Sequence, residues 1–198
     1  MTLGSVRQWH WISSALCLVG MLLFAVTGIT LNHAAAISTT PRIQTVELTV
    51  PADLLVSLEI PDDGVGPLPD KLRRWLDDKH GLVVGDDAKG EWDDAEVYVS
   101  LPRPGGDAWL SLDLESGELL YERTDRGWVS YLNDLHKGRN TGLAWSWFID
   151  LFAVACVVFC VTGLVLLYRQ TVSRPSTWPM VGLGLVIPLL LVVLFVHS

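Results

Sequence analysis

The chain has 198 residues, half of them hydrophobic, and its 22 acidic residues outnumber 14 basic ones to give a formal charge of −8. An acidic chain is unsuited to nucleic acid as a partner, because binding phosphates requires a surplus of Lys and Arg. No charged side chain occurs within residues 12–31, 151–167 or 180–196, whereas residues 42–139 hold most of the acids. The sequence therefore predicts three apolar segments and one acidic domain.

The first apolar segment covers about residues 9–31. At a rise of 1.5 Å per residue, a helix of this length spans a hydrocarbon core of about 30 Å. The segment exceeds the apolar core of about 7–15 residues that a secretory signal peptide carries. We interpret it as an uncleaved transmembrane helix, and cleavage near the small residues Ala34 to Ala36 is the alternative.

The acidic middle of the chain is expected to fold as a small α+β domain. Residues 43–50 alternate apolar and polar side chains, as a half-buried strand does, and residues 61–69 are rich in Pro, Asp and Gly, which predicts a loop. A helix is predicted before Gly81, a residue suited to ending one. Its apolar face would hold Leu68, Leu72, Trp75 and Leu76.

Further strands are predicted where alternation returns, and an amphipathic helix follows them. The hairpin between the last two strands would turn at Gly117. The helix would lie along a membrane surface with Trp128, Tyr131, Leu132 and Leu135 on its apolar side. The predicted strands cover residues 95–101, 108–114 and 119–124.

The second and third apolar segments complete the predicted topology. Trp145 and Trp147 at one end of the second segment, and Tyr168 at the other, are typical of the aromatic belts at membrane interfaces. Pro188 predicts a kink in the third segment. The expected parts are an N-terminus with helix one (1–33), the α+β domain (34–127), the interfacial helix (128–140), helix two (141–169), a loop (170–177) and helix three (178–198).

Short basic segments set the expected orientation. Arg7 precedes the first span, and Arg169 and Arg174 lie between the second and third. Because Lys and Arg are enriched in cytoplasmic loops, we expect a multi-pass protein with a cytoplasmic N-terminus and an extracytoplasmic middle domain. Lys137 and Arg139 go against this rule locally.

Four of the five histidines lie at the ends of apolar segments: His10, His33, His136 and His197. Neutral imidazole is a common ligand of haem iron and other transition metals. On the expected topology the last three gather near the outer membrane surface, so His33 is expected to pair with His136 first and with His197 second. His10 lies 23 residues from His33, about 34 Å along a helix, and would need an oligomer or another ligand type. Alternatively, these side chains are amphipathic interface residues that hold no ligand.

Asp150 lies about two turns into the second span, where an unpaired acid is costly. It is expected to act as a proton or metal relay, or to hold helices together by a hydrogen bond to Ser13, Ser14, Thr27 or Thr30. The repeated Val-Thr-Gly at residues 26–28 and 161–163 would let helices approach closely.

Two other groups of side chains invite a metal-binding interpretation. Cys156 and Cys160 are four residues apart on one helix, but a small apolar packing role is the preferred interpretation. Four Asp-Asp pairs match no EF-hand spacing and are interpreted as a solvated surface. These pairs begin at Asp62, Asp77, Asp86 and Asp93.

Residues 8–33, QWHWISSALCLVGMLLFAVTGITLNH, resemble the first helix of the PepSY-associated transmembrane (PepSY-TM-like) family. LSLDLESGELL at 110–120 and the segment 134–169, which begins DLHKGRNTGLAW, are similar to that family's PepSY-like hairpin and second helix. The resemblance implies a membrane α-helical protein of the bacterial inner membrane, with three transmembrane helices and an inserted small α+β (PepSY-like) extracytoplasmic, periplasmic domain.

The resemblance also implies a function linked to iron and siderophore uptake, since larger relatives act as haem-containing reductases of ferric siderophores. His33 in LNH and His136 in DLH match family positions for which ligation of haem b is expected, and His10 in WHW matches the family's other characteristic histidine. This chain has three spans and one PepSY-like unit, fewer than those relatives. That departure favours a homo-oligomer, or a helper role beside a periplasmic iron-uptake partner in the lipid bilayer.

Three functions are therefore kept open. The first is an inner-membrane b-haem electron-transfer protein, or a helper, for ferric or siderophore reduction, which would make the chain a membrane reductase component. The second is a non-enzymatic, membrane-anchored PepSY module that binds a periplasmic protein or peptide. The third is copper or zinc handling at the outer histidines.

Overall fold

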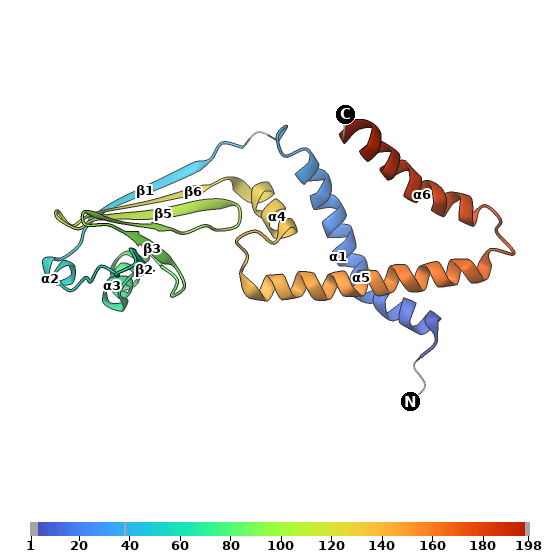
Figure 1. The fold of residues 1–198 in the computed structure, drawn as a ribbon, viewed down its shortest axis with the longest axis horizontal. Coiled ribbons are helices and arrows are strands. Elements are labelled where there is room, and N and C mark those ends of the chain that lie inside the picture. The colour runs from blue at the N-terminus through green and yellow to red at the C-terminus, as the bar shows by residue number, and fades with distance from the viewer. Residues whose placement is uncertain (1–3, 38, 197–198) are drawn as a thin grey trace. The chain divides into compact units, whose positions relative to one another are not determined.

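The computed structural model describes residues 4–37 and 39–196. They form two compact units, one made of the chain up to Leu23 together with the chain from Trp147 onward, and the other of Phe24–Ser146. Two long helices, α1 (Val6–Asn32) and α5 (Gly142–Gln170), contribute residues to both units. Figure 1 shows the elements in chain order.

Among the residues that the structure describes, three helices are long and apolar enough to cross a membrane: α1, α5 and the continuous helical segment Thr177–Val196. They cover the three predicted apolar segments. Their side chains are largely exposed, which is what an apolar helix facing lipid requires, since a helix in water would bury its apolar stripe. The last segment consists of α6 (Thr177–Leu191) and a π-helical turn, Val192–Val196, that begins four residues after Pro188. Proline has no backbone N–H and displaces the carbonyl one turn before it, so a change of helix type close by is expected.

A stripe of small residues on α1 faces α5. Ser13 and Cys17 are buried on α1, and Cys17 lies beside Cys156. A Cβ added to Gly20 would come within 2.3 Å of the ring of Phe152. Because the contacting residue numbers rise along α1 as they fall along α5, the two helices run antiparallel here. Cys17 therefore packs as a small apolar residue between the helices, and small side chains allow the close approach.

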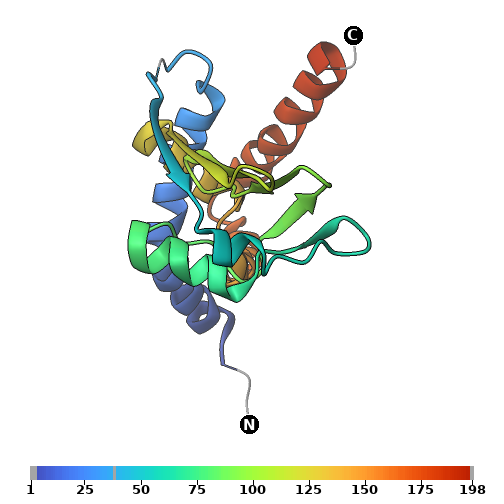
Figure 2. The ribbon, with the colours of Figure 1, turned by 90° about the vertical axis from the view of Figure 1, so that its left-hand side faces the viewer.

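The α+β domain is built on a six-stranded antiparallel sheet with the strand order β1-β6-β5-β4-β3-β2. Two helices, α2 and α3, lie on one side of it (Figures 1 and 2). The helices are α2 (Ala52–Leu55) and α3 (Asp70–His80), and the strands are β1 (Arg42–Thr49), β2 (Val65–Pro67), β3 (Lys89–Trp92), β4 (Glu96–Ser100), β5 (Gly106–Asp113) and β6 (Glu118–Asp125).

Alternating side chains in the strands create the core of this domain. In β5, Ala108, Leu110 and Leu112 are buried while the intervening residues are partly exposed, which is the pattern of a strand with one covered face. The apolar face of α3 covers them, and Gly81 ends that helix in the left-handed conformation at φ 65°. The predicted helix and the four predicted strands are confirmed. The core consists of Val50, Leu68, Leu72, Leu76, Val84, Trp92, Val97, Val99, Leu110, Leu112 and Leu119.

The segment predicted as a loop, residues 61–69, contains strand β2, so that prediction is wrong over three residues. Strand β3, which pairs with β2, was not predicted either. The buried indole of Trp92 donates a hydrogen bond to the Gly66 carbonyl at 3.1 Å and fastens the two strands. This tertiary contact stabilises a Gly- and Pro-containing strand whose own residues disfavour it.

Helix α4 (Gly127–Lys137) is fixed to the sheet by polar contacts rather than by its apolar side. The buried Asp134 carboxylate accepts the Gly105 N–H at 2.9 Å and pairs with Arg139 at 2.7 Å. The indole of Trp128 and the ring of Tyr131 are exposed, at 72% and 45%. An exposed aromatic side is what an interfacial helix needs, although its position at a membrane surface stays a prediction.

Candidate functional site: two histidines held by a repeated segment

A five-residue segment occurs twice in the long helices. Residues 24–28 of α1 read FAVTG, and residues 159–163 of α5 read FCVTG. In a helix, positions one, four and five of such a segment share one face, so Phe, Thr and Gly line up. Each copy contacts one histidine from another helix.

His10 of α1 lies on the copy in α5. Its Nδ1 is 3.1 Å from the Thr162 hydroxyl oxygen and 3.3 Å from the Phe159 carbonyl oxygen. Its ring stacks on the Phe159 ring, with centroids 4.8 Å apart and planes 14° apart. Gly163 makes room for the imidazole, because a Cβ there would lie 3.3 Å from His10 Cε1. The half-buried histidine is thereby fixed on three sides.

These hydrogen bonds determine which nitrogen of His10 carries the proton. The Thr162 hydroxyl donates to the Val158 carbonyl at 2.6 Å, so its oxygen accepts from the imidazole. The Phe159 carbonyl can only accept. Nδ1 of neutral His10 is therefore the donor, and Nε2 carries the lone pair that can bind a metal.

His10 also lines an apolar cavity of about 600 Å³. Apart from Gln170, the other lining side chains come from the apolar part of α5. A volume of this order is typical of a small-molecule or cofactor site. The other lining residues are Phe159, Cys160, Gly163, Leu164, Leu166, Leu167 and Gln170.

His136 of α4 lies on the copy in α1 in the same way. Its Nδ1 is 2.7 Å from the Thr27 hydroxyl oxygen, and its ring lies against Phe24, with centroids 4.9 Å apart and planes tilted by 43°. A Cβ on Gly28 would lie 3.6 Å from His136 Cε1. Since the Thr27 hydroxyl is directed to the Phe24 carbonyl at 3.2 Å, its oxygen accepts from Nδ1, and Nε2 again carries the lone pair.

A neighbouring contact positions α4 next to this site. The Thr30 hydroxyl donates to Asn133 Oδ1 at 2.9 Å, and Asn133 is buried. The Trp145 indole donates to the Leu135 carbonyl at 2.9 Å, which fixes the end of α4 to the start of α5. Both bonds restrict the position of the helix that carries His136.

His33 is exposed just beyond α1, and its Nδ1 donates to the Ile29 carbonyl at 3.0 Å. Within the described part of the chain, the imidazoles of His33 and His136 have different hydrogen-bond partners, and their two rings do not contact each other. Their joint ligation of one metal stays a prediction, and His197 lies outside the described residues. His80, at the end of α3, packs against the Trp75 ring, with centroids 4.6 Å apart and planes 64° apart.

Asp150 is exposed on α5 and forms no hydrogen bond or ion pair with any residue that the structure describes. The hydroxyls considered as its partners bond elsewhere: Ser13 donates to the Trp9 carbonyl at 2.8 Å, while Thr27 and Thr30 contact α4. A hydrogen bond from Asp150 that holds this helix pair together is therefore not formed within the described residues. Its role as a relay stays a prediction.

Among residues 4–37 and 39–196, no three His, Cys, Asp or Glu side chains are grouped to hold a metal ion. The residues that sequence reasoning missed are the partners of the histidines. Val-Thr-Gly was interpreted as a helix-packing signal, whereas its Thr and Gly here hold an imidazole. Phe24 and Phe159 begin the two copies of the repeat, and their presence beside Val-Thr-Gly was the sequence signal that could have indicated these contacts.

Neither the curated proteins nor the solved structures contain a match to this chain. One family model, described as "Putative PepSY_TM-like", matches residues 1–197, nearly the whole chain. The match covers both copies of the repeated segment, the α+β domain and the apolar helices. The chain thus belongs to the PepSY_TM-like family.

Proposed function

We propose that the chain is a membrane electron-transfer protein that binds haem b through His10 and His136. The observation that carries this proposal is the setting of His10: its Nε2 bonds to no residue that the structure describes, and its ring lines an apolar cavity of about 600 Å³. An imidazole fixed through Nδ1 with Nε2 available is the arrangement found around metal-ligating histidines.

The chemistry of the residues fits the group. A porphyrin is flat and largely apolar, and the leucines and Phe159 around His10 offer a matching surface. The second haem site would be the one at His136, with His33 as the expected second ligand. His10 has no second histidine near it on α5, so its iron would take a ligand from a second copy of the chain.

Bound haem would supply a reversible one-electron carrier. The protein's own residues would set its environment. Thr27 and Thr162 would hold the imidazoles in one orientation, the glycines would leave room for the rings, and the apolar helix surfaces would exclude water. Two histidine sites, one near each end of α1, suit electron transfer across a bilayer.

The proposed setting is the bacterial inner membrane, with the N-terminus in the cytoplasm and the α+β domain in the periplasm. The proposed role is in ferric or siderophore reduction, as a reductase component or as a helper of one, which the resemblance seen in the sequence implies. The proposal includes a homo-oligomer, because His10 lacks a partner histidine among the residues around its cavity.

A visible absorption spectrum of the detergent-purified protein tests this function. We expect a reduced-minus-oxidised haem signal that falls by about half in His10→Ala or His136→Ala and is lost in the double variant. His80→Ala is the matched control, because His80 lies in the α+β domain against Trp75. A colourless protein would reject the proposal in favour of a non-enzymatic binding module, and elemental copper or zinc without porphyrin would favour metal handling.

A further inference from the structure

The α+β domain contains a second cavity, of about 730 Å³, on the same sheet face as its core. Cross-strand register places Gln44, Arg123 and Ala108 side by side on β1, β6 and β5. Arg123 is two residues beyond Tyr121 and four beyond the buried Leu119, so all three share the core face. The cavity is therefore the continuation of the core face, walled by residues 81–89 and 100–103.

The cavity is lined by more cations than acids, in a chain where acids dominate. Lys89, Arg103 and Arg123 line it together with one acid, Asp87. Arg103 and Arg123 are half-buried, and neither forms an ion pair or a side-chain hydrogen bond with any residue that the structure describes. Both therefore keep their guanidinium donors available in the cavity.

This lack of partners is not a general feature of the domain. Four other arginines pair with aspartates: Arg73 with Asp70 and Asp86, Arg74 with Asp70, Arg126 with Asp107, and Arg139 with Asp134. A half-buried guanidinium gains most from a bidentate oxyanion, since its five N–H groups match two oxygens at once.

We propose that this cavity, which forms a groove on the sheet face, binds a small organic anion that bears two or more carboxylates, held by Arg103 and Arg123. The Gln44 amide offers a further polar contact, and Val46 and Tyr121 offer an apolar floor. The volume is within the range that holds a small molecule. The proposal does not depend on haem binding, because the groove consists only of residues of the α+β domain.

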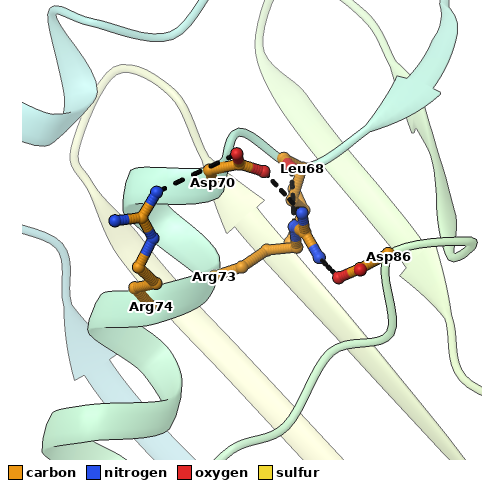
Figure 3. Close-up of polar contacts among 5 residues, drawn as sticks. All are labelled: Leu68, Asp70, Arg73, Arg74 and Asp86. Atoms are coloured by element: carbon orange, nitrogen blue, oxygen red, sulfur yellow. Dashed lines mark hydrogen bonds and ion pairs between the residues drawn. The ribbon is translucent and has the colours of Figure 1, made fainter.

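One wall of the groove is held in place before any ligand arrives. The Arg73 guanidinium on α3 bridges Asp70 and Asp86, and its Nε donates to the Leu68 carbonyl at 3.1 Å (Figure 3). Asp86 lies in the same segment as the lining residues Gly85 and Asp87. The hydrogen bonds that Arg73 donates to Asp86 and then to Asp70 raise its pKa, so the bridge stays charged. A preformed wall lowers the entropy lost on binding.

Calorimetric titration of the full chain in detergent with citrate tests the proposal. We expect saturable binding that weakens by about tenfold or more in Arg103→Gln and in Arg123→Gln, because each variant loses a charged hydrogen-bond donor set. Arg42→Gln is the control: it removes the same charge from an exposed position on β1 outside the groove, and binding should not change. The trimethyl ester of citrate should not bind.

Inorganic phosphate is the second probe. Phosphate that binds as tightly as citrate would overturn the assignment to carboxylates, and so would a wild-type protein that does not bind citrate. A chemical-modification experiment on the wild type keeps the proposal testable if the variants do not fold. Citrate should slow the modification of Arg103 and Arg123 by phenylglyoxal, mapped by mass spectrometry, while Arg42 reacts at an unchanged rate. If citrate changed the modification rate of neither Arg103 nor Arg123, the proposal would be contradicted.

Discussion

His136 and Thr27 are joined by a hydrogen bond of 2.7 Å although 109 residues separate them in the chain. The bond links α4 to α1 and fixes the proton of His136 on Nδ1. The same kind of contact joins His10 of α1 to Thr162 of α5. Two segments that differ at one residue thus impose the same imidazole tautomer at two places.

Replacing either threonine with valine should release only its own histidine. In Thr27→Val we expect His136 to lose its Nδ1–H preference, and in Thr162→Val we expect the preference of His10 to weaken, since the Phe159 carbonyl still accepts. Each lost bond contributes about 0.5–1.5 kcal/mol. Nitrogen-15 NMR of labelled histidine rings reports the tautomer directly. The matching Thr→Ser variants keep the hydroxyl and should retain the wild-type signals; unchanged signals in the valine variants would contradict the assignment.

Enlarging Gly20 should separate α1 from α5. A Cβ at this position meets the Phe152 ring at 2.3 Å, so Gly20→Leu must displace the ring and part of the helix, at about 1–3 kcal/mol. Thermal unfolding in detergent should show a lower transition temperature. Gly182→Leu in α6 is the control, because nothing lies within 4 Å of its added Cβ. An equal loss in both variants would show that the helix contact is not the cause.

Gly105→Ala should destabilise the attachment of α4 to the sheet. Gly105 has φ 75°, and a Cβ there would lie 2.8 Å from the Tyr131 Cα, a backbone atom that cannot move away alone. Gly127 has φ 83° with nothing near its added Cβ, so Gly127→Ala measures the conformational strain by itself, about 1–2 kcal/mol. We expect a clearly larger loss of unfolding free energy for Gly105→Ala. Similar losses of unfolding free energy in the two variants would mean that α4 can move away from the added Cβ without loss of stability.

The turn between β5 and β6 should weaken in acid. Hydrogen bonds from the Ser116 N–H and hydroxyl, and then from the Glu115 N–H, lower the pKa of the Asp113 carboxyl. A carboxyl with a folded pKa below its unfolded value contributes stability above the unfolded pKa and loses it as the pH falls through the folded pKa. The melting temperature should therefore fall less in acid for Asp113→Asn than for the wild type. A parallel fall in both proteins would contradict this.

The parts of the fold that follow a strong local pattern could be predicted from the sequence. Unbroken apolar stretches define α1 and α5, and alternation defines β1 and β4 to β6. The missed strands, β2 and β3, have three and four residues and contain Gly66, Pro67 and Gly90. Their pairing depends on the buried indole of Trp92, a contact that no local pattern contains.

The histidines could be predicted as candidates, but their partners could not. His10 and His136 are recognisable because imidazoles at the ends of apolar stretches are unusual. Which helix receives each one depends on the antiparallel packing of α1 against α5, which small residues such as Gly20 permit but do not specify. The expected pairing of His33 with His136 rests on membrane depth and on the family resemblance, and it stays a prediction.

The first helix carries both His10 and Thr27, and this has a consequence for the order in which the chain is made. Thr27 leaves the ribosome long before His136, and His10 long before Thr162, so the first helix alone holds half of each contact. A chain stopped before residue 136 could complete neither. The His136 contact can form once α4 has been made, whereas the His10 contact must wait for α5. Anything that binds both imidazoles is therefore loaded late in biogenesis.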